Sequence, residues 1–299
     1  MGTNSGIDYV DASWGPWRGC TPVSEGCRNC YARRDMRRFG MDFYTVTRAS
    51  DKTFYAPTEW TEPKLIFVCP WGDFFHKAAD EWRRDALDVI EACPQHTFVI
   101  PTKRTERMLG CLYGETGRHY LGGGDYIPNV WILASVEDQK TADRRIPELL
   151  TLHQYGDWPV LGVSYEPALG PVDFERDYDS IGGMRTWLDM LDWLVMGGES
   201  GPYARPMHPD WVRQTRDACV AAGVPFFFKQ WGEWENAGLL YREGESINLL
   251  NDGNIISDSE YVVGAGADMS PARMVRVGKK AAGHIIDGRK WRRLPEATK

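Results

Sequence analysis

Three cysteines lie close together near the start of the chain: Cys20, Cys27 and Cys30, in a C-x6-C-x2-C arrangement. The loop between them contains Pro22 and Gly26, which favour turns, so the three thiols can converge on one face of a metal centre. Cysteine sulfur is the usual ligand of iron–sulfur clusters. Three protein ligands instead of four would leave one iron open to a substrate or cofactor, as catalytic metal sites leave one position open.

Two other interpretations of these cysteines stay open. They could bind a structural zinc ion with a fourth ligand such as His76 or Cys69, or they could bind no metal. The total of seven cysteines is odd and unevenly spread, which does not indicate a disulfide framework. The four cysteines outside the loop lack ligand spacing, so we expect them in the core rather than at a second cluster.

Glu166 and Lys229 are candidates for substrate-side catalytic groups, because each closes a predicted buried strand. Lys229 follows three phenylalanines, so its amine could be partly desolvated, with a lowered pKa, and serve as an acid or base or as a positive anchor. The alternative is an ion pair between the two side chains. His208 precedes a predicted helix and is expected to cap it or pack rather than to bind a ligand.

Short apolar segments, each ending in polar or glycine-rich residues, must position these groups. They are nearly continuous rather than alternating, which is typical of strands buried on both faces of a parallel sheet. The predicted strands are 64–70, 97–103, 130–136, 158–167, 192–198 and 224–230. Helix-compatible stretches lie between them at 81–92, 140–153 and 209–222, the last followed by Gly223 as a C-terminal cap.

The repeated βα order predicts an α/β fold, a partial or complete parallel (β/α) barrel, with the working loops at the C-terminal ends of the strands. After Trp234 this order stops, and turn signals at 242–245 and 251–254 predict a small β hairpin. We therefore predict a barrel domain with its cysteine loop over 1–234. Residues 235–299 would form a β-hairpin appendage and a basic C-terminal segment.

The cysteine loop at the start of a βα series resembles the radical S-adenosylmethionine (SAM) superfamily. In that superfamily a partial barrel holds a 4Fe-4S cluster that binds SAM at its unique iron, although the usual spacing is C-x3-C-x2-C. More closely, the chain resembles, nearly end to end, phage and bacterial three-Cys-motif proteins of undetermined function. The matching segments are 19–32, 95–98 with 102–104, 135–139, 197–211, 224–234 and 277–291.

The superfamily resemblance implies that Cys20, Cys27 and Cys30 hold the cluster. The cluster would reduce SAM to a 5'-deoxyadenosyl radical, which abstracts a hydrogen atom from an inert carbon, while the protein binds and orients. An electron donor is then a required partner. The resemblance also suggests SAM-binding residues, which are Asp73, Ser135, Glu137, Gly197, Gly198 and Glu199. For the two glycines, a tight strand-to-loop turn is an equal alternative.

The net charge of -7 hides a basic C-terminal segment, in which residues 273–299 carry nine Lys or Arg against two acidic residues. A basic stripe is also expected after the cysteine loop, at Arg33, Arg34, Arg37 and Arg38. Both could contact a phosphate backbone or be plain solvated surface. With the phage resemblance, they suggest a nucleic-acid base as substrate, such as a hypermodified thymidine in phage DNA, extruded into the barrel mouth.

Two other functions stay open. The first is a nucleic-acid-binding module whose cysteines bind zinc or an inert cluster. The second is a metal-dependent hydrolase or nuclease built on the carboxylates of Asp73, Glu137, Glu166 and Glu199. The sequence has neither an apolar stretch of membrane-spanning length nor a secretory signal at its N-terminus, so we expect a cytoplasmic protein of a bacterium or phage-infected cell, without membrane contact.

Overall fold

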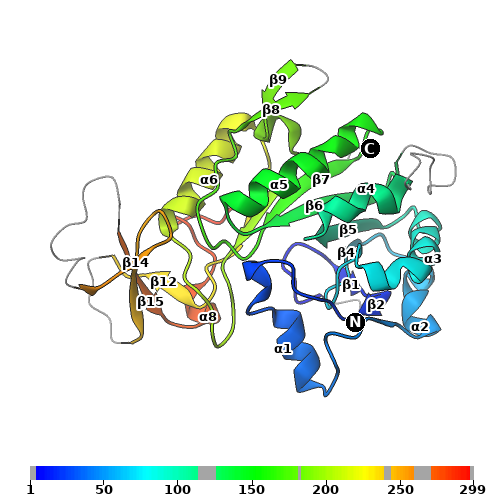
Figure 1. The fold of residues 1–299 in the computed structure, drawn as a ribbon, viewed down its shortest axis with the longest axis horizontal. Helices are drawn as coiled ribbons and strands as arrows, with labels where there is room; N and C mark the ends of the chain where they lie inside the picture. Colours follow the sequence, from blue (N-terminus) through cyan, green and yellow to red (C-terminus); the bar gives the residue numbers. More distant parts are fainter. Residues whose placement is uncertain (1–4, 114–125, 181–182, 239–243, 259–270, 297–299) are drawn as a thin grey trace. The chain divides into compact units, whose positions relative to one another are not determined.

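The computed structural model describes residues 5–113, 126–180, 183–238, 244–258 and 271–296 (Figure 1). It confirms the predicted α/β class: seven strands form one sheet in the order β1-β4-β5-β6-β7-β10-β11, consistent with a partial parallel β/α barrel. The strands are β1 (Ala12–Trp14), β4 (Leu65–Val68), β5 (Thr97–Thr102), β6 (Val130–Val136), β7 (Val160–Tyr165), β10 (Trp193–Gly197) and β11 (Phe226–Gln230).

The last six of these strands coincide with the six predicted apolar segments, and β1 was not predicted. All residues of β6, β7 and β10 are buried, which explains why their sequences are continuously apolar. Neighbouring strands pair in parallel, for example with Phe98 of β5 opposite Val130 of β6. β1 has three residues, too few to show a pattern by themselves.

The main helices lie between the strands in the sequence (Figure 1). They are α1 (Tyr31–Arg38), α2 (Asp51–Phe54), α3 (Asp80–Glu91), α4 (Thr105–Tyr113), α5 (Gln139–Leu150), α6 (Pro209–Ala222) and α8 (Lys279–Ala282). The predicted bounds of α6 are confirmed. His208 caps its start by accepting a hydrogen bond from Asp210 N at 3.1 Å, and Gly223 ends it with a left-handed φ of 77°. None of the described helices is long and apolar enough to span a membrane.

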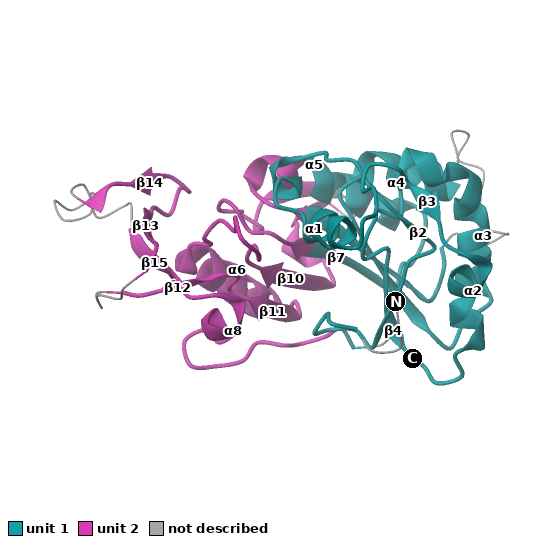
Figure 2. Ribbon diagram, turned by 90° about the horizontal axis from the view of Figure 1, so that it is seen from below, with its two compact units in different colours: residues 1–135, 144–163, 295–299 teal, residues 136–143, 164–294 magenta. Residues whose placement is uncertain are grey.

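The chain divides into two compact units (Figure 2). Unit 1 contains residues 1–135, 144–163 and 295–299, and unit 2 contains residues 136–143 and 164–294. Unit 1 thus includes the cysteine loop and β1, β4 and β5, whereas unit 2 includes β10, β11 and α6. The domain boundary predicted after residue 234 stays a prediction.

Short antiparallel strands complete unit 2. The predicted hairpin is formed by β13 (Ser246–Leu249) and β14 (Ile255–Ile256), and it belongs to a four-stranded sheet in the order β12-β15-β13-β14 with β12 (Trp234–Asn236) and β15 (Ala272–Arg276). Another pair joins β8 (Asp177–Ser180) and β9 (Gly183–Thr186). In unit 1, β2 (Trp17–Arg18) pairs with β3 (Thr47–Arg48).

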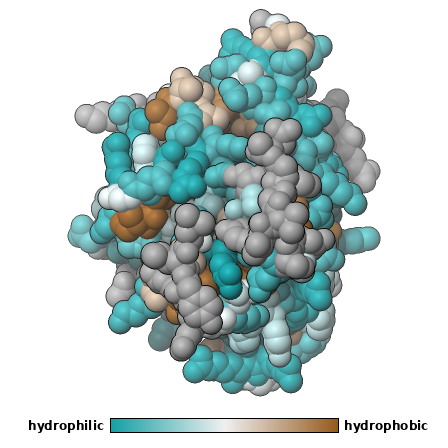
Figure 3. Space-filling view, turned by 90° about the vertical axis from the view of Figure 1, so that its left-hand side faces the viewer, coloured by the Kyte–Doolittle hydropathy of each residue, from teal (hydrophilic) through white to brown (hydrophobic). Residues whose placement is uncertain are grey.

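The face in Figure 3 is mostly hydrophilic, with hydrophobic residues in small separate patches.

Candidate functional site

The cysteine loop lies in unit 1, and local backbone requirements explain its path. Gly19 has a φ of 100°, and a Cβ there would lie closer than 3.0 Å to Thr45 O, so only glycine fits. Cys20 N then donates to Phe43 O at 2.8 Å. Cys27 ends a short 3-10 helix, and Cys30 is the N-terminal cap residue of α1. All three are free thiols of intermediate exposure.

Cys20 and Cys30 belong to one small packed cluster. Both lie against three buried residues, which are Ala32, Met36 and Phe43. Cys27 is held from the other end of the loop, where its Sγ lies 3.9 Å from Ser24 Oγ. Cys20 and Cys30 therefore pack against the same buried residues. Cys27 lies in the same loop but contacts Ser24 instead.

Arg104 is the charged group nearest to Cys20. It follows β5, its side chain is buried, and its Nη1 donates to Cys20 Sγ at 3.4 Å. Its Nη2 donates to the carbonyl and hydroxyl oxygens of Thr21 at 2.7 and 2.9 Å. Burial raises the pKa of the Cys20 thiol to about 11, while the positive charge of Arg104 opposes this shift. Arg104 thus favours the thiolate form that a metal ligand requires.

Asp73 holds Arg104 in place. Its Oδ1 accepts from Thr102 Oγ1 at 2.8 Å and Phe75 N at 3.0 Å. Its Oδ2 accepts from Lys103 N at 3.1 Å and Arg104 Nη1 at 3.3 Å. A carboxylate offers about four acceptor positions, so these donors fill it. Asp73, suggested as a SAM-binding residue, is therefore engaged in positioning the loop after β5 and the arginine beside Cys20.

His76 completes this network. Its Nδ1 accepts from Ala78 N at 3.1 Å, so in the neutral ring the proton is on Nε2, which lies 3.1 Å from Thr21 Oγ1. Burial lowers its pKa, and the charge of Arg104 lowers it further. Because both ring nitrogens are engaged, the structure does not favour His76 as a fourth zinc ligand. Among the described residues no group of three or more His, Cys, Asp or Glu, the three loop cysteines included, is arranged to hold a metal, so the cluster stays a prediction.

Three thiols are a donor set that suits an iron–sulfur cluster and zinc alike. The three candidate ligands are all soft thiols on one partly exposed loop, and one of them already receives a charged hydrogen bond. Hydrogen bonds to ligand sulfur are among the features by which proteins tune such clusters.

In unit 2, Glu166 and Lys229 form an ion pair. Lys229 Nζ lies 2.7 Å from Glu166 Oε2, and both side chains are mostly buried, with exposed fractions of 22% and 16%. Ser164 Oγ donates to the other carboxylate oxygen at 3.4 Å. Gly197 lies against the pair, since a Cβ there would be 3.2 Å from Glu166 Oε2. The structure thus brings together three of the predicted residues, and their catalytic role stays a prediction.

Gly198 and Glu199 continue this loop. A Cβ on Gly198 would lie closer than 3.0 Å to Trp231 O, so the glycine is needed where two loop backbones meet. Glu199 is buried and receives a fork from Arg205, with Nε to Oε2 at 2.9 Å and Nη2 to Oε1 at 2.7 Å. These contacts match the alternative of a tight strand-to-loop turn, and SAM binding by these residues stays a prediction.

Ser135 and Glu137 fall in different units. Both are buried. Ser135 O accepts from Arg145 Nη1 at 2.6 Å, whereas Glu137 O accepts from Leu169 N at 2.8 Å. These contacts use the backbone oxygens, so the side-chain roles expected from the sequence stay predictions.

The predicted basic segments are largely on the surface. Arg34, Arg37 and Arg38 of α1 are exposed and Arg33 is half-buried. In the C-terminal segment the exposed cations are Lys279, Lys280, Arg289, Lys290, Arg292 and Arg293. Lys299, also part of the predicted basic segment, lies outside the described residues.

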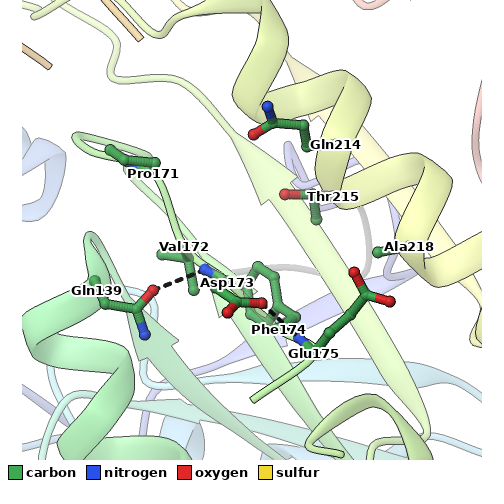
Figure 4. Close-up of a pocket in the computed structure, with 9 residues that line it drawn as sticks. All are labelled: Gln139, Pro171, Val172, Asp173, Phe174, Glu175, Gln214, Thr215 and Ala218. Carbon is green, nitrogen blue, oxygen red and sulfur yellow. Dashed lines mark hydrogen bonds between the residues drawn. The ribbon is translucent and has the colours of Figure 1, made fainter. Parts of the chain in front are cut away.

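A groove of about 510 Å³ lies elsewhere in unit 2, between residues 171–175 and α6 (Figure 4). Gln139 Oε1 accepts from Asp173 N at 2.7 Å at one side, and Gln214 and Thr215 of α6 line the other. None of the predicted site residues lines this groove.

Arg104 was not assigned to the cysteine loop from the sequence. The one feature of the sequence that could have indicated a role for Arg104 is its position directly after the predicted strand 97–103. Its contact with Cys20 joins residues 84 positions apart, which no local pattern reveals.

Comparisons with solved structures give two distant similarities. No curated protein matches the chain. A spore photoproduct lyase variant solved with a dinucleoside spore photoproduct is 12% identical with a TM-score of 0.36, over 60% of this chain and 53% of that one. A tyrosine-to-phenylalanine variant of spore photoproduct lyase is 10% identical with a TM-score of 0.39, over 69% and 71%.

The chain thus spans about half the length of the first solved structure, and likeness at this level establishes neither its fold nor its activity. The family model covers nearly the whole sequence, at residues 4–295, and is described as a protein of unknown function. This chain therefore belongs to the DUF5131 family.

Proposed function

We propose that the protein is a radical SAM enzyme that modifies or isomerises a nucleic-acid base. The observation that carries this proposal is the cysteine loop with a buried arginine donating to Cys20 Sγ at 3.4 Å. Three cysteine ligands would leave one iron of a cluster without a protein ligand, which is what SAM binding requires.

In this proposal Cys20, Cys27 and Cys30 hold a 4Fe-4S cluster, which when bound would supply the electron that cleaves SAM into methionine and a 5'-deoxyadenosyl radical. Arg104 orients Cys20 and favours its thiolate through a charge-assisted hydrogen bond. Asp73 acts one step further out, because its four accepted hydrogen bonds fix Arg104 and the end of β5. The electron donor would be a separate reductant.

Glu166 and Lys229 are the proposed substrate-side groups. Lys229 Nζ donates to Glu166 Oε2 at 2.7 Å, so the ammonium group is held in place, where it could hydrogen-bond to a substrate heteroatom. The superfamily resemblance would place SAM at the loop of Gly197 and Gly198, although Glu166 and Trp231 already fill the space beside these two glycines. The basic surfaces would retain a nucleic-acid substrate through its phosphates.

Three of the four carboxylates that a metal-dependent hydrolase would use are engaged by cations. Asp73 and Glu199 each receive an arginine, and Glu166 receives Lys229. No observation favours this second function.

The test is anaerobic purification with iron and sulfide, followed by measurement of bound iron and of 5'-deoxyadenosine formed from SAM with dithionite. We expect about four irons per chain and deoxyadenosine formation that Cys27→Ala abolishes. Cys111→Ala, a change at a half-exposed cysteine on α4, is the matched control and should retain both. Tightly bound zinc without SAM cleavage would refute the proposal.

A further inference from the structure

Helix α1 presents arginines and exposed aromatic rings together, beside the cysteine loop. We call this set the α1 surface, and it consists of Tyr31, Arg33, Arg34, Arg37, Arg38, Phe39 and Tyr44. The helix anchors itself with only two buried side chains, Ala32 and Met36, spaced four residues apart on one face. Arg34, Arg37 and Arg38 lie outside this buried face and are exposed.

The aromatic residues of the α1 surface are unusually exposed. Phe39 is 63% exposed, Tyr44 is 55% exposed and Tyr31 is 42% exposed. Phe39 lies against Trp71, with ring centroids 5.8 Å apart, and the Tyr44 hydroxyl accepts from Arg33 Nη1 at 3.3 Å. These contacts hold Phe39 and Tyr44, while much of each ring remains accessible to solvent.

The charge of the α1 surface is strongly positive. Four arginines fall within six consecutive residues, at 33, 34, 37 and 38, and the acid among them, Asp35, lies 3.7 Å from Arg34 Nε. Arginine pairs with phosphate oxygens and also stacks on planar rings. The charge therefore favours a polyanion that also carries planar groups.

The α1 surface is continuous with the cysteine loop. Trp71, the partner of Phe39, packs against the same three buried residues as Cys20 and Cys30. Tyr31 directly follows Cys30, and its hydroxyl donates to Pro70 O at 2.7 Å. A polymer held on this surface would lie beside the proposed reaction centre.

We propose that the α1 surface binds single-stranded nucleic acid, with the arginines on phosphates and Phe39 and Tyr44 stacked on bases. A duplex offers its phosphates but hides its base faces, so exposed rings add affinity only where bases are unstacked. This inference rests on the proposed function and deepens it, because it names the form of the substrate: a base in a single-stranded or locally opened segment.

The test is binding of the full-length protein to a fluorescent 12-nucleotide oligothymidine and to the matching duplex, by anisotropy, at several salt concentrations. We expect the single strand to bind more tightly than the duplex. Phe39→Ala should weaken single-strand binding about 5- to 100-fold, the range measured for a lost base–aromatic stack. Phe39→Trp should retain binding, whereas Phe39→Leu, which keeps an apolar side chain, should not.

The arginines have a separate readout. Arg37→Gln should lower the slope of log affinity against log salt by about 0.7, the value per phosphate contact on a single strand. Arg84→Gln on α3 and Tyr55→Ala are matched controls, since they remove an exposed arginine and a 43% exposed ring of unit 1 outside the α1 surface. Both should bind as the unaltered protein does.

Equal binding of Phe39→Ala and the unaltered protein would overturn the proposal, as would tighter binding of the duplex. Binding does not require SAM cleavage, so the two proposals fail separately. Loss of deoxyadenosine formation with a normal Phe39 effect would refute the radical reaction alone. Normal deoxyadenosine formation without single-strand preference would refute the α1 surface alone.

Discussion

Replacing Asp73 by asparagine tests whether this carboxylate holds the network beside Cys20. Asparagine keeps the shape but turns one acceptor oxygen into an NH2 group. Whichever way the amide is oriented, it faces a pair of donors: Thr102 Oγ1 with Phe75 N, or Lys103 N with Arg104 Nη1. Two buried donors therefore lose their acceptor.

The magnitude follows from burial. The side chains of Asp73 and Arg104 are 7% and 6% exposed, so the pair is screened little by solvent. Removing one partner of a buried pair costs about 3–5 kcal/mol, because the other charge stays buried without compensation. Asp88→Asn is the control: Asp88 pairs with Arg84 at 2.9 Å, both side chains are about half exposed, and such pairs contribute roughly 0–1 kcal/mol.

The assay is native-state hydrogen exchange at the amides of Phe75 and Lys103, which donate to Asp73, combined with thermal unfolding of the metal-free protein. We expect faster exchange at both amides and a lowered Tm for Asp73→Asn. The double variant Asp73→Asn with Arg104→Met should lose less stability than the two single variants added together, because neither charge is then stranded. Unchanged exchange at both amides, or strictly additive losses, would refute the reasoning.

Three further predictions concern pH and packing. The pKa of His76 is lowered in the folded protein, so the unfolded chain binds the proton more tightly. The contribution of His76 to the free energy of unfolding is therefore fully present above about pH 6.5 and is lost as the pH falls below that value. His76→Gln should flatten this part of the plot of unfolding free energy against pH. Gly198→Ala should destabilise unit 2 by about 1–3 kcal/mol in denaturant unfolding, because its Cβ would collide with Trp231 O, whereas Gly110→Ala, with open space around it, should not destabilise. The pKa of Cys20 is about 11, so in the metal-free protein its alkylation by iodoacetamide should become about tenfold faster with each pH unit up to pH 11. The rate is followed by peptide mass spectrometry. A plateau of the rate near pH 9 would contradict a pKa raised by burial.

The sequence by itself determined six strands of the seven-stranded sheet and both ends of α6. Strands buried on both faces require continuous apolar residues, so six of them were evident without a structure. The end of α6 was equally local, because Gly223 adopts a left-handed φ that other residues avoid. β1 was missed because three residues carry too little pattern, and its place beside β4 depends on pairing with distant residues.

The partners of the polar residues were decided only by the tertiary structure. The sequence placed Asp73, Glu166 and Glu199 after strands, which is correct for each, and it offered the Glu166–Lys229 ion pair as an alternative. It gave no sign of the arginines that meet Asp73 and Glu199. Arg104 reaches Cys20 across 84 residues, and Lys229 reaches Glu166 across 63. Such contacts depend on how crossovers and strand register bring loop ends together, and short-range residue spacing contains no information on either.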